Sequence, residues 1–259
     1  MTGSDSESKR VKAIDTTIDV LQAVQQFDGA SITKLANHLD CSKSTIHGHI
    51  TTLQSHGYLT RRPDNKYHLG LKFADLGRAS RKKYEYFGDI QSTVDRLANE
   101  TGERAQYMVE ENGLGVYLYR ATGARAPPTD AEVGKHRELH VCASGKAILA
   151  HLSEDRRVEI IKQHGVIGRT ENTITDRETL FSSLAEVHER GYAINDQESV
   201  KGVWGLGAPV MNENREVLGG LSISGPTHRM KNQENHVEHF ANKVIGVTEE
   251  IGLDISYSK

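Results

Sequence analysis

Two short helices joined by a two-residue connection are the feature that most restricts what this chain can fold into. Each begins at a serine that can cap it and carries apolar residues at helical spacing: Ser31 before Ile32, Leu35, Ala36 and Leu39, and Ser42 before Ile46, Ile50 and Leu53. Asp40 and Cys41 leave room only for a tight turn between the helices. This pattern is typical of a helix-turn-helix unit.

The neighbouring segments complete that unit. Apolar residues recur at helical spacing over residues 14–24, up to a Phe-Asp-Gly stop, so a first helix precedes the pair. A glycine ends the third helix, and residues 58–60 and 67–69 predict two short strands around a Pro-Asp-Asn turn. We therefore predict a winged helix-turn-helix domain over residues 11–72.

The remainder of the chain has a different organisation. A long helical pattern over residues 73–102 predicts a linker helix. After it we expect strands and helices, with strands over residues 104–110, 115–120, 192–194, 207–211 and 217–224, and helices over residues 143–152, 156–164, 177–190 and 232–251. The first two strands flank Glu111-Asn112-Gly113, a strong hairpin signal. Strands interrupted by helices on one side predict an α+β domain with an antiparallel sheet over residues 103–259.

Length and charge favour two domains of different character. A chain of 259 residues is long enough for two domains of ordinary size. Its formal net charge is −3, but residues 1–83 hold 13 Lys and Arg against 8 Asp and Glu, and residues 84–259 hold 19 against 27, so the halves carry +5 and −8. A basic module joined to an acidic one indicates a nucleic-acid binder with a sensing or assembly domain. A chance fluctuation on two solvated surfaces is the alternative.

Composition excludes several classes of protein. No apolar run approaches the roughly 20 residues of a membrane helix, and the polar residues 1–10, expected to form a disordered tail, lack the apolar block of a signal peptide. We therefore expect a cytoplasmic protein without membrane contact. Cys41 and Cys142 lie far apart and outside CxxC spacing, which excludes a disulfide scaffold and a zinc ribbon.

The third helix carries a polar face opposite its apolar stripe. Ser44, His47, Gly48 and Thr51 recur there, and their small size would let the helix enter a DNA major groove with hydroxyls and an imidazole near base edges. Its first turn offers hydroxyls, backbone N–H groups and a lysine to phosphates, from Ser42, Lys43, Ser44 and Thr45.

The predicted hairpin is basic. Arg61, Arg62, Asn65 and Lys66 surround its turn, and we expect them to reach an adjacent groove or the DNA backbone. An ordinary solvated hairpin is the alternative, but the attachment to a unit of three helices favours the DNA contact.

Motifs from both halves of the chain together resemble one family. Residues 42–47, followed by Gly57-Tyr58-Leu59 and Tyr67-His68-Leu69-Gly70, are similar to the DNA-binding domain of IclR-type transcriptional regulators. The similar segments of the second half are, in order, residues 139–147, 191–193, 198, 208–210 and 222–226. The resemblance covers nearly the whole chain after the tail. It implies a GAF-like effector domain, a homodimer or dimer of dimers, and a pocket for a small carboxylate-bearing or aromatic metabolite.

Residues of the second half indicate how such a pocket would bind an acid. Ser222 and Ser224 stand two apart on a predicted strand, so both hydroxyls project from one face and can hydrogen-bond a carboxylate or polyol. Ala143 and Ser144 open a helix whose backbone N–H groups can hold an anion. The alternatives are two solvent-facing strand serines and a plain N-cap at Ser144.

The chain departs from the family pattern at four positions. Asn195 stands where the pattern has an aspartate, Gly205 where it prefers Cys, Ser or Ala, and Met211 where it has an aromatic residue or His. Loss of an acidic acceptor favours an anionic ligand, and Gly205 leaves room for a larger one unless Trp204 refills the space. Many relatives carry an arginine at the position of Gly48, so base readout falls to the polar neighbours of that glycine.

Other chemistries find little support. His136, His140 and Cys142 have spacings that a metal can use, but no fourth ligand is evident. Residues 144–146 lack the upstream glycine of a phosphate-binding loop, and no Ser/His/Asp or paired-carboxylate arrangement stands out as catalytic. We therefore expect no cofactor, no metal and no catalytic residue.

These features together predict a ligand-responsive transcriptional regulator that binds double-stranded DNA. One short recognition helix specifies too few base pairs alone, so we expect a symmetric dimer on a near-palindromic operator. The expected effector is a small organic or sugar acid of carbon metabolism. Two alternatives stay open: an enzyme or small-molecule binding protein whose helix-turn-helix serves only assembly, and a sequence-tolerant architectural DNA binder.

Overall fold

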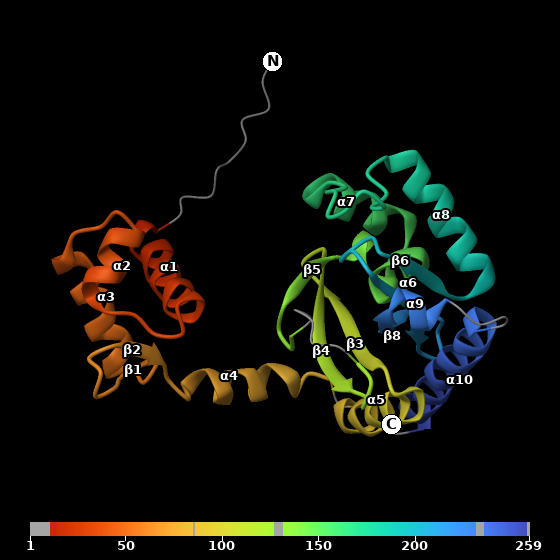
Figure 1. The fold of residues 1–259 in the computed structure, drawn as a ribbon, viewed down its shortest axis with the longest axis horizontal. Helices are drawn as coiled ribbons and strands as arrows, with labels where there is room; N and C mark the ends of the chain where they lie inside the picture. Colours follow the sequence, from red (N-terminus) through yellow and green to blue (C-terminus); the bar gives the residue numbers. More distant parts are fainter. Residues whose placement is uncertain (1–10, 85, 127–131, 232–235, 258–259) are drawn as a thin grey trace, which may run out of the picture. The chain divides into compact units, whose positions relative to one another are not determined.

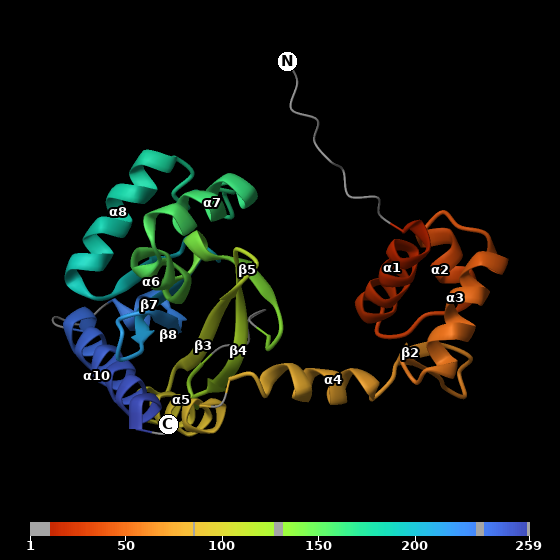
Figure 2. The same ribbon diagram turned by 180° about the vertical axis from the view of Figure 1, so that it is seen from behind.

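The computed structural model describes residues 11–84, 86–126, 132–231 and 236–257, and Figures 1 and 2 show it from two opposite sides. The chain divides into two units, one within residues 1–83 and one within residues 84–259. The tail predicted over residues 1–10 lies outside the described residues. No helix in the described ranges is long and apolar enough to cross a membrane.

The first unit is a winged helix-turn-helix domain. Its elements are α1 (Lys12–Gln26), α2 (Ile32–His38), α3 (Lys43–Ser55), the antiparallel pair β1 (Leu59–Arg61) and β2 (Tyr67–Leu69), and α4 (Lys72–Arg81). The Ser31 and Ser42 hydroxyls accept hydrogen bonds from backbone N–H groups of Lys34 and Thr45, at 3.3 and 3.1 Å, as N-caps do. Its core consists of buried apolar side chains, among them Val20, Val24, Leu35, Ile46, Ile50, Leu53 and Leu59.

The segment predicted as one linker helix over residues 73–102 forms two helices. α4 ends in a turn at Lys82 and Lys83, and α5 (Phe87–Thr101) follows. α4, which is described in full, buries none of its residues, whereas α5 buries one face in the core of the second unit. The expectation of a single linker helix is therefore corrected, because α5 is a structural part of the second unit.

The second unit is built on a six-stranded sheet in which every neighbouring pair is antiparallel. The strand order is β5-β4-β3-β8-β7-β6, with bounds β3 (Arg104–Glu111), β4 (Leu114–Thr122), β5 (His136–Glu138), β6 (Ala193–Asp196), β7 (Val203–Met211) and β8 (Val217–Pro226). Asn112 and Gly113 join β3 to β4 with φ angles of +54° and +82°, as the hairpin signal predicts. The sequence pattern does not predict β5.

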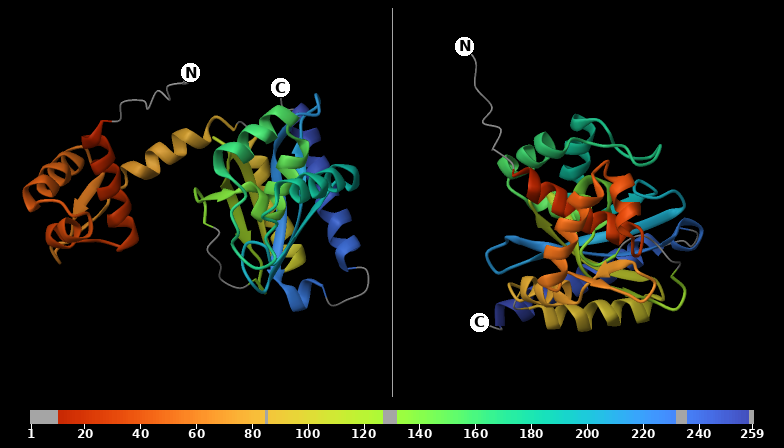
Figure 3. Two further views of the ribbon diagram at one scale, coloured as in Figure 1. Left: turned by 90° about the horizontal axis from the view of Figure 1, so that it is seen from above. Right: turned by 90° about the vertical axis from the view of Figure 1, so that its left-hand side faces the viewer.

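Helices cover both faces of this sheet, as Figure 3 shows. α5 and α10 (His236–Tyr257) pack on one face, and α6 (Ala143–His151), α7 (Glu154–His164) and α8 (Arg177–Arg190) lie on the other. The short helices η1 (Leu139–Val141) and α9 (Thr227–Met230) connect these elements. The prediction that helices cover one side is therefore wrong, whereas the α+β fold with an antiparallel sheet is confirmed.

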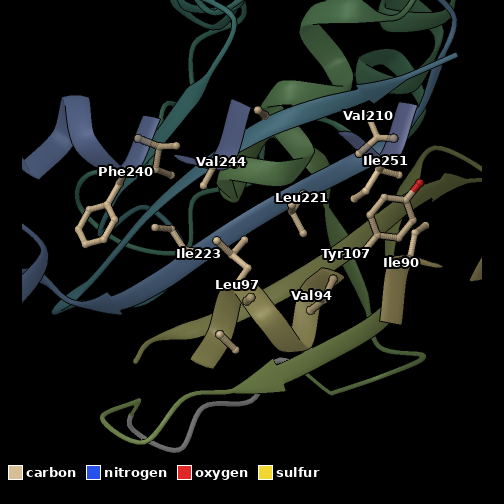
Figure 4. Packing of buried hydrophobic residues seen from close by; sticks show 14 of the residues in the cluster. Ile90, Val94, Leu97, Tyr107, Val210, Leu221, Ile223, Phe240, Val244 and Ile251 are labelled. Carbon is tan, nitrogen blue, oxygen red and sulfur yellow. The ribbon is translucent and has the colours of Figure 1, made fainter. Parts of the chain in front are cut away.

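The core beneath α5 and α10 sets the orientation of the side chains on β8. It brings together apolar side chains of both helices and the sheet, including Ile90, Val94, Leu97, Tyr107, Val210, Leu221, Ile223, Phe240, Val244 and Ile251 (Figure 4). Since Leu221 and Ile223 project into this core, Ser222 and Ser224 project from the opposite face of the strand. The predicted alternation along this strand is therefore present.

We predict that Leu97→Ala strongly destabilises the second unit. Leu97 is 1% exposed, so its truncation should lower the free energy of unfolding by about 2–5 kcal/mol. Trp204, the one tryptophan of the sequence, is buried in the same core and reports its unfolding by fluorescence in a denaturant titration. Leu253→Ala in α10, at a site 58% exposed, is the matched control and should cost less than about 0.5 kcal/mol. Equal losses in the two variants would contradict the packing of α5 described above.

Candidate DNA-binding face and ligand cavity

α3 presents a continuous polar face to solvent. The exposed residues include all those predicted to contact DNA from this helix, namely Ser42, Lys43, Ser44, Thr45, His47 and Thr51. The Ser42 hydroxyl lies 2.8 Å from that of Ser44 and 2.9 Å from that of Thr45, so the first turn forms one hydroxyl cluster. The positive end of the helix dipole lies at this turn. The geometry suits a phosphate there, and the DNA contact itself stays a prediction.

Two details of α3 affect what its middle can recognise. Thr51 Oγ1 donates to the His47 carbonyl at 2.8 Å, which leaves the hydroxyl mainly as an acceptor toward other groups. Nothing lies within 4 Å of the position that a Cβ on Gly48 would take, so the helix surface there is open. The exposed His47 ring beside it can both donate and accept hydrogen bonds.

The wing formed by β1 and β2 presents the predicted cations. Arg61, Arg62 and Lys66 are all exposed. Arg61 Nη2 donates to Asn65 Oδ1 at 2.8 Å, and Lys66 Nζ lies 3.6 Å from Asp64 Oδ2. Exposed interactions of this kind contribute only about 0–1 kcal/mol, so they do not prevent these cations from binding phosphates.

The second unit contains a cavity between the sheet and the N-terminal end of α6. Residues of all six strands, of the start of α6 and of the loop after β6 line it. Its volume is about 490 Å³, including space open to solvent. These dimensions suit a small molecule.

Five of the six predicted effector-binding residues line this cavity, namely Ala143, Asn195, Gly205, Ser222 and Ser224. The sixth, Ser144, is fully buried, and its Oγ lies 3.6 Å from Met108 Sδ. Ser144 is the second residue of α6, whose N-cap is Cys142, so the N-cap alternative for Ser144 is wrong, while its role in effector binding stays a prediction. Its side chain packs beneath the helix and is absent from the described lining.

Two glycines let α6 approach the sheet closely. A Cβ on Gly207 would lie 2.7 Å from Ser144 N, and one on Gly220 would lie 2.5 Å from Ser144 O. Any side chain at either position would therefore displace the start of α6 from β7 and β8. The glycines place the first N–H groups of this helix at the wall of the cavity.

Sequence reasoning missed two cations in the cavity. Arg104 on β3 and Arg137 on β5 line it and are 2% and 7% exposed. Gln106 on β3 lines it too. The sequence of β3 did contain a signal for this position. The apolar neighbours of Arg104 and Gln106 face the core beneath α5, so Arg104 and Gln106 lie on the same face of the sheet as the two serines of β8. For Arg137, in the short strand β5, no periodic signal exists.

Asn195 organises the loop that closes one side of the cavity. Its Nδ2 donates to Val141 O and to Ser199 Oγ, both at 2.9 Å, and its Oδ1 accepts from the Glu198 N–H at 2.8 Å. An ionised aspartate has no N–H to donate, so it could not bind the Val141 carbonyl oxygen. Asn195 on β6 therefore links η1, through Val141, to the loop after β6.

A buried ion pair fixes the same loop against α6. Lys146 Nζ lies 2.6 and 2.7 Å from the two carboxylate oxygens of Glu198, and the residues are 3% and 6% exposed. Thr173 Oγ1 donates to the Glu198 carbonyl at 2.7 Å. Charges buried to this degree persist because each neutralises the other. Lys146 therefore has a structural role in this ion pair. That role accounts for the lysine of the Ser144-Gly145-Lys146 sequence without a phosphate-binding loop.

The remaining candidates lie outside any reactive arrangement. Burial raises the pKa of the Cys142 thiol, so the thiol is protonated at neutral pH. Burial lowers the pKa of His140, whose Nε2 lies 3.0 Å from the Ile167 carbonyl oxygen. In the described ranges no three His, Cys, Asp or Glu side chains gather as a metal site requires. Met211 lines a separate groove between β7 and α10, so that departure from the family pattern does not affect this cavity.

We predict that Lys146→Met lowers the free energy of unfolding by about 3–5 kcal/mol, because it leaves the Glu198 carboxylate buried without its cation. Denaturant titration followed by Trp204 fluorescence measures this loss. The matched control is Lys201→Met, which removes an exposed pair with Glu171 at 3.2 Å and should cost at most about 1 kcal/mol. Adding Glu198→Leu to the first variant should restore much of the stability. A double variant as unstable as the single one would contradict the account.

Comparison with known proteins relates both units to one family. The family model of the bacterial transcriptional regulator IclR C-terminal domain matches residues 82–253, and that of the IclR helix-turn-helix domain matches residues 13–63. The probable HTH-type transcriptional regulator ArcR of Halobacterium salinarum is 29% identical over 89% of this chain and 89% of its own length. The HTH-type transcriptional regulator XynR of Escherichia coli is 28% identical over 86% of this chain and 90% of its own.

Solved structures agree with this assignment. Thermotoga maritima IclR has a TM-score of 0.78 at 25% identity, covering 95% of this chain and 98% of its own. An IclR homologue from Microbacterium hydrocarbonoxydans, crystallised with 4-hydroxybenzoate, has a TM-score of 0.76 at 21% identity, covering 93% and 98%. With family models matching both of its units, the chain belongs to the IclR family of transcriptional regulators, with an N-terminal DNA-binding helix-turn-helix domain and a C-terminal effector domain.

Proposed function

We propose that this regulator acts in the cytoplasm, binds a near-palindromic operator as a dimer or dimer of dimers, and changes its affinity for that operator when a small carboxylic or sugar acid of carbon metabolism binds. The observation that carries the proposal is the cavity of the second unit, whose polar lining suits an acid. It lies in the same chain as a domain with an exposed recognition helix.

The surface of the first unit supports the DNA contact. The hydroxyl cluster at the start of α3, the exposed His47 and the basic wing present donors to phosphates and base edges. Residues 1–83 carry a net charge of +5. We assign to this contact the nine residues Ser42, Lys43, Ser44, Thr45, His47, Thr51, Arg61, Arg62 and Lys66.

An apolar stripe on α1 supports assembly. Val11, Ile14 and Ile18 lie next to or within α1 and are 59%, 58% and 46% exposed. Apolar side chains at this spacing share one helix face, and such a face is ordinarily covered by a partner. A second copy of the chain as that partner would also double the number of base pairs read.

The lining of the cavity supports an acid as effector. Ala143 contributes an N-terminal backbone N–H of α6, and Ser222 and Ser224 contribute hydroxyls, so a carboxylate can be bound without a metal. One solved homologue points the same way, because the 4-hydroxybenzoate in the structure of the Microbacterium protein is itself a carboxylate. The effector changes DNA affinity only if it binds the two arrangements of the protein unequally.

The DNA contact predicts different effects for two exposed side chains. Arg62→Ala should weaken binding to operator and unrelated DNA alike, and lower the slope of log affinity against log salt by about one, because it removes one phosphate contact. His47→Ala should cost about 1–3 kcal/mol on the operator alone. Fluorescence anisotropy with promoter fragments at several salt concentrations measures both, with Lys12→Ala on α1 as the control. If the protein prefers no promoter fragment over unrelated DNA, the regulator proposal is wrong and an assembly or architectural role is favoured.

The effector contact predicts a loss of affinity in Ser222→Ala/Ser224→Ala. Removing hydrogen bonds to a charged group should weaken the binding of a carboxylate about tenfold or more. Calorimetry of the full chain with small carboxylates and sugar acids measures the change. The double variant Ser182→Ala/Ser183→Ala on α8, outside the cavity, is the control. Unchanged affinity in the first variant would remove the two strand serines from the site.

A further inference from the structure

We propose that Gln106 selects effectors that carry a hydroxyl group on the carbon next to the carboxylate, that is, 2-hydroxy acids. This inference rests on the proposed function, since it specifies which acids the same cavity takes. It follows from the place of Gln106 in the sheet, from the single proton that Ser222 can donate, and from one buried oxygen atom of the Gln106 amide.

The sheet places Gln106 beside the expected carboxylate site. Ser222 on β8 pairs with Gly207 on β7 on one side and with Gln106 on β3 on the other. Gly207 lies under the first turn of α6, because a Cβ on it would lie 2.7 Å from Ser144 N. Residues paired across neighbouring strands share one face of the sheet, so the start of α6, Ser222 and Gln106 follow one another along one row. Gln106 is therefore the next polar side chain after Ser222 in this row.

Ser222 determines which end of the Gln106 amide faces it. A serine hydroxyl has one proton and a carboxylate only accepts, so a Ser222 that binds the effector donates that proton to it. The Ser222 oxygen can then accept from the protein, and Gln106 Nε2 donates to it at 3.3 Å. This order leaves the acceptor of the same amide, Gln106 Oε1, for a different partner.

Gln106 Oε1 is an acceptor that the protein itself does not satisfy. Gln106 lines the cavity and is 6% exposed, and its Oε1 is buried with no hydrogen-bond partner among the described residues. A buried amide oxygen ordinarily accepts a hydrogen bond. Oε1 and Nε2 are bonded to one carbon atom, so a donor to Oε1 lies close to the carboxylate that Ser222 binds. In a bound acid this position corresponds to a substituent of the carbon next to the carboxylate.

The chemistry of the lining identifies that donor as a hydroxyl group. A 2-oxo acid presents a carbonyl oxygen, which cannot donate and would face Gln106 Oε1 acceptor to acceptor. A buried ammonium, as in an amino acid, requires an anionic partner, and the described lining contains no Asp or Glu. A hydroxyl is neutral and donates one proton, so it satisfies Oε1 without adding a charge. The cavity therefore favours a 2-hydroxy acid over the corresponding 2-oxo, 2-amino and unsubstituted acids.

Matched acids test this proposal on the full-length protein by calorimetry. Lactate, pyruvate, alanine and propionate share three carbons and one carboxylate, and the carbon next to the carboxylate carries a hydroxyl, an oxo group, an ammonium or only hydrogen. We expect lactate to bind about tenfold or more tightly than each of the other three. Gluconate and 2-deoxygluconate repeat the comparison in a longer acid, and gluconate should bind about tenfold or more tightly.

Variants assign the preference to Gln106. Gln106→Met keeps the length of the side chain but removes the amide, so lactate affinity should fall to within about threefold of propionate affinity, which itself should change by less than about threefold. Ser222→Ala should instead weaken lactate and propionate alike, because the two acids share the carboxylate. Gln163→Met on α7, exposed and outside the described lining, is the matched control and should leave the preference unchanged. The fluorescence of buried Trp204 verifies that each variant is folded.

The outcomes separate this inference from the proposed function. Pyruvate, alanine or propionate binding as tightly as lactate, or a preference for lactate that persists in Gln106→Met, would overturn the role of Gln106 and leave the acid effector standing. An acid effector without a 2-hydroxyl group, found among the other carboxylates, would do the same. Binding of no acid at all would overturn both. A preference for lactate and gluconate that disappears in Gln106→Met and persists in Gln163→Met supports the assignment.

Discussion

The close contact between α6 and the sheet is the constraint on which the effector domain depends. Gly207 and Gly220 have no Cβ, and the backbone of Ser144 occupies the space that a Cβ would take at either position. This contact places the start of α6 at the cavity wall and sets the depth at which the ion pair of Lys146 and Glu198 is buried. The loop after β6 is thereby closed over the same space.

Local signals predict the first unit well, because its determinants lie close together in the sequence. Ser31 and Ser42 cap their helices as expected, and the apolar stripe behind Ser42 is buried while the polar face is exposed. The alternation of Ser222 and Ser224 with apolar neighbours likewise predicts their common face. Such patterns require only the period of a helix or a strand.

The rest depends on tertiary contacts that periodicity does not encode. The helical pattern continues through Lys82 and Lys83, where neither Gly nor Pro marks the break between α4 and α5. Arg137 belongs to a three-residue strand, which is too short to show an alternation of polar and apolar residues. Its position in the cavity wall follows only from the pairing of β5 with β4. The orientation of Ser144 is set by Met108, 36 positions away in the sequence.

The open surface at Gly48 has an evolutionary consequence. No atom lies within 4 Å of the site of a Cβ there, so the middle of α3 accepts a new side chain without repacking its core. An exposed mid-helix glycine also disfavours the helix by about 1 kcal/mol relative to alanine, so such a replacement begins with a gain in stability. Divergence of operator preference among descendants of this regulator can therefore proceed by single substitutions, each starting from an intact fold.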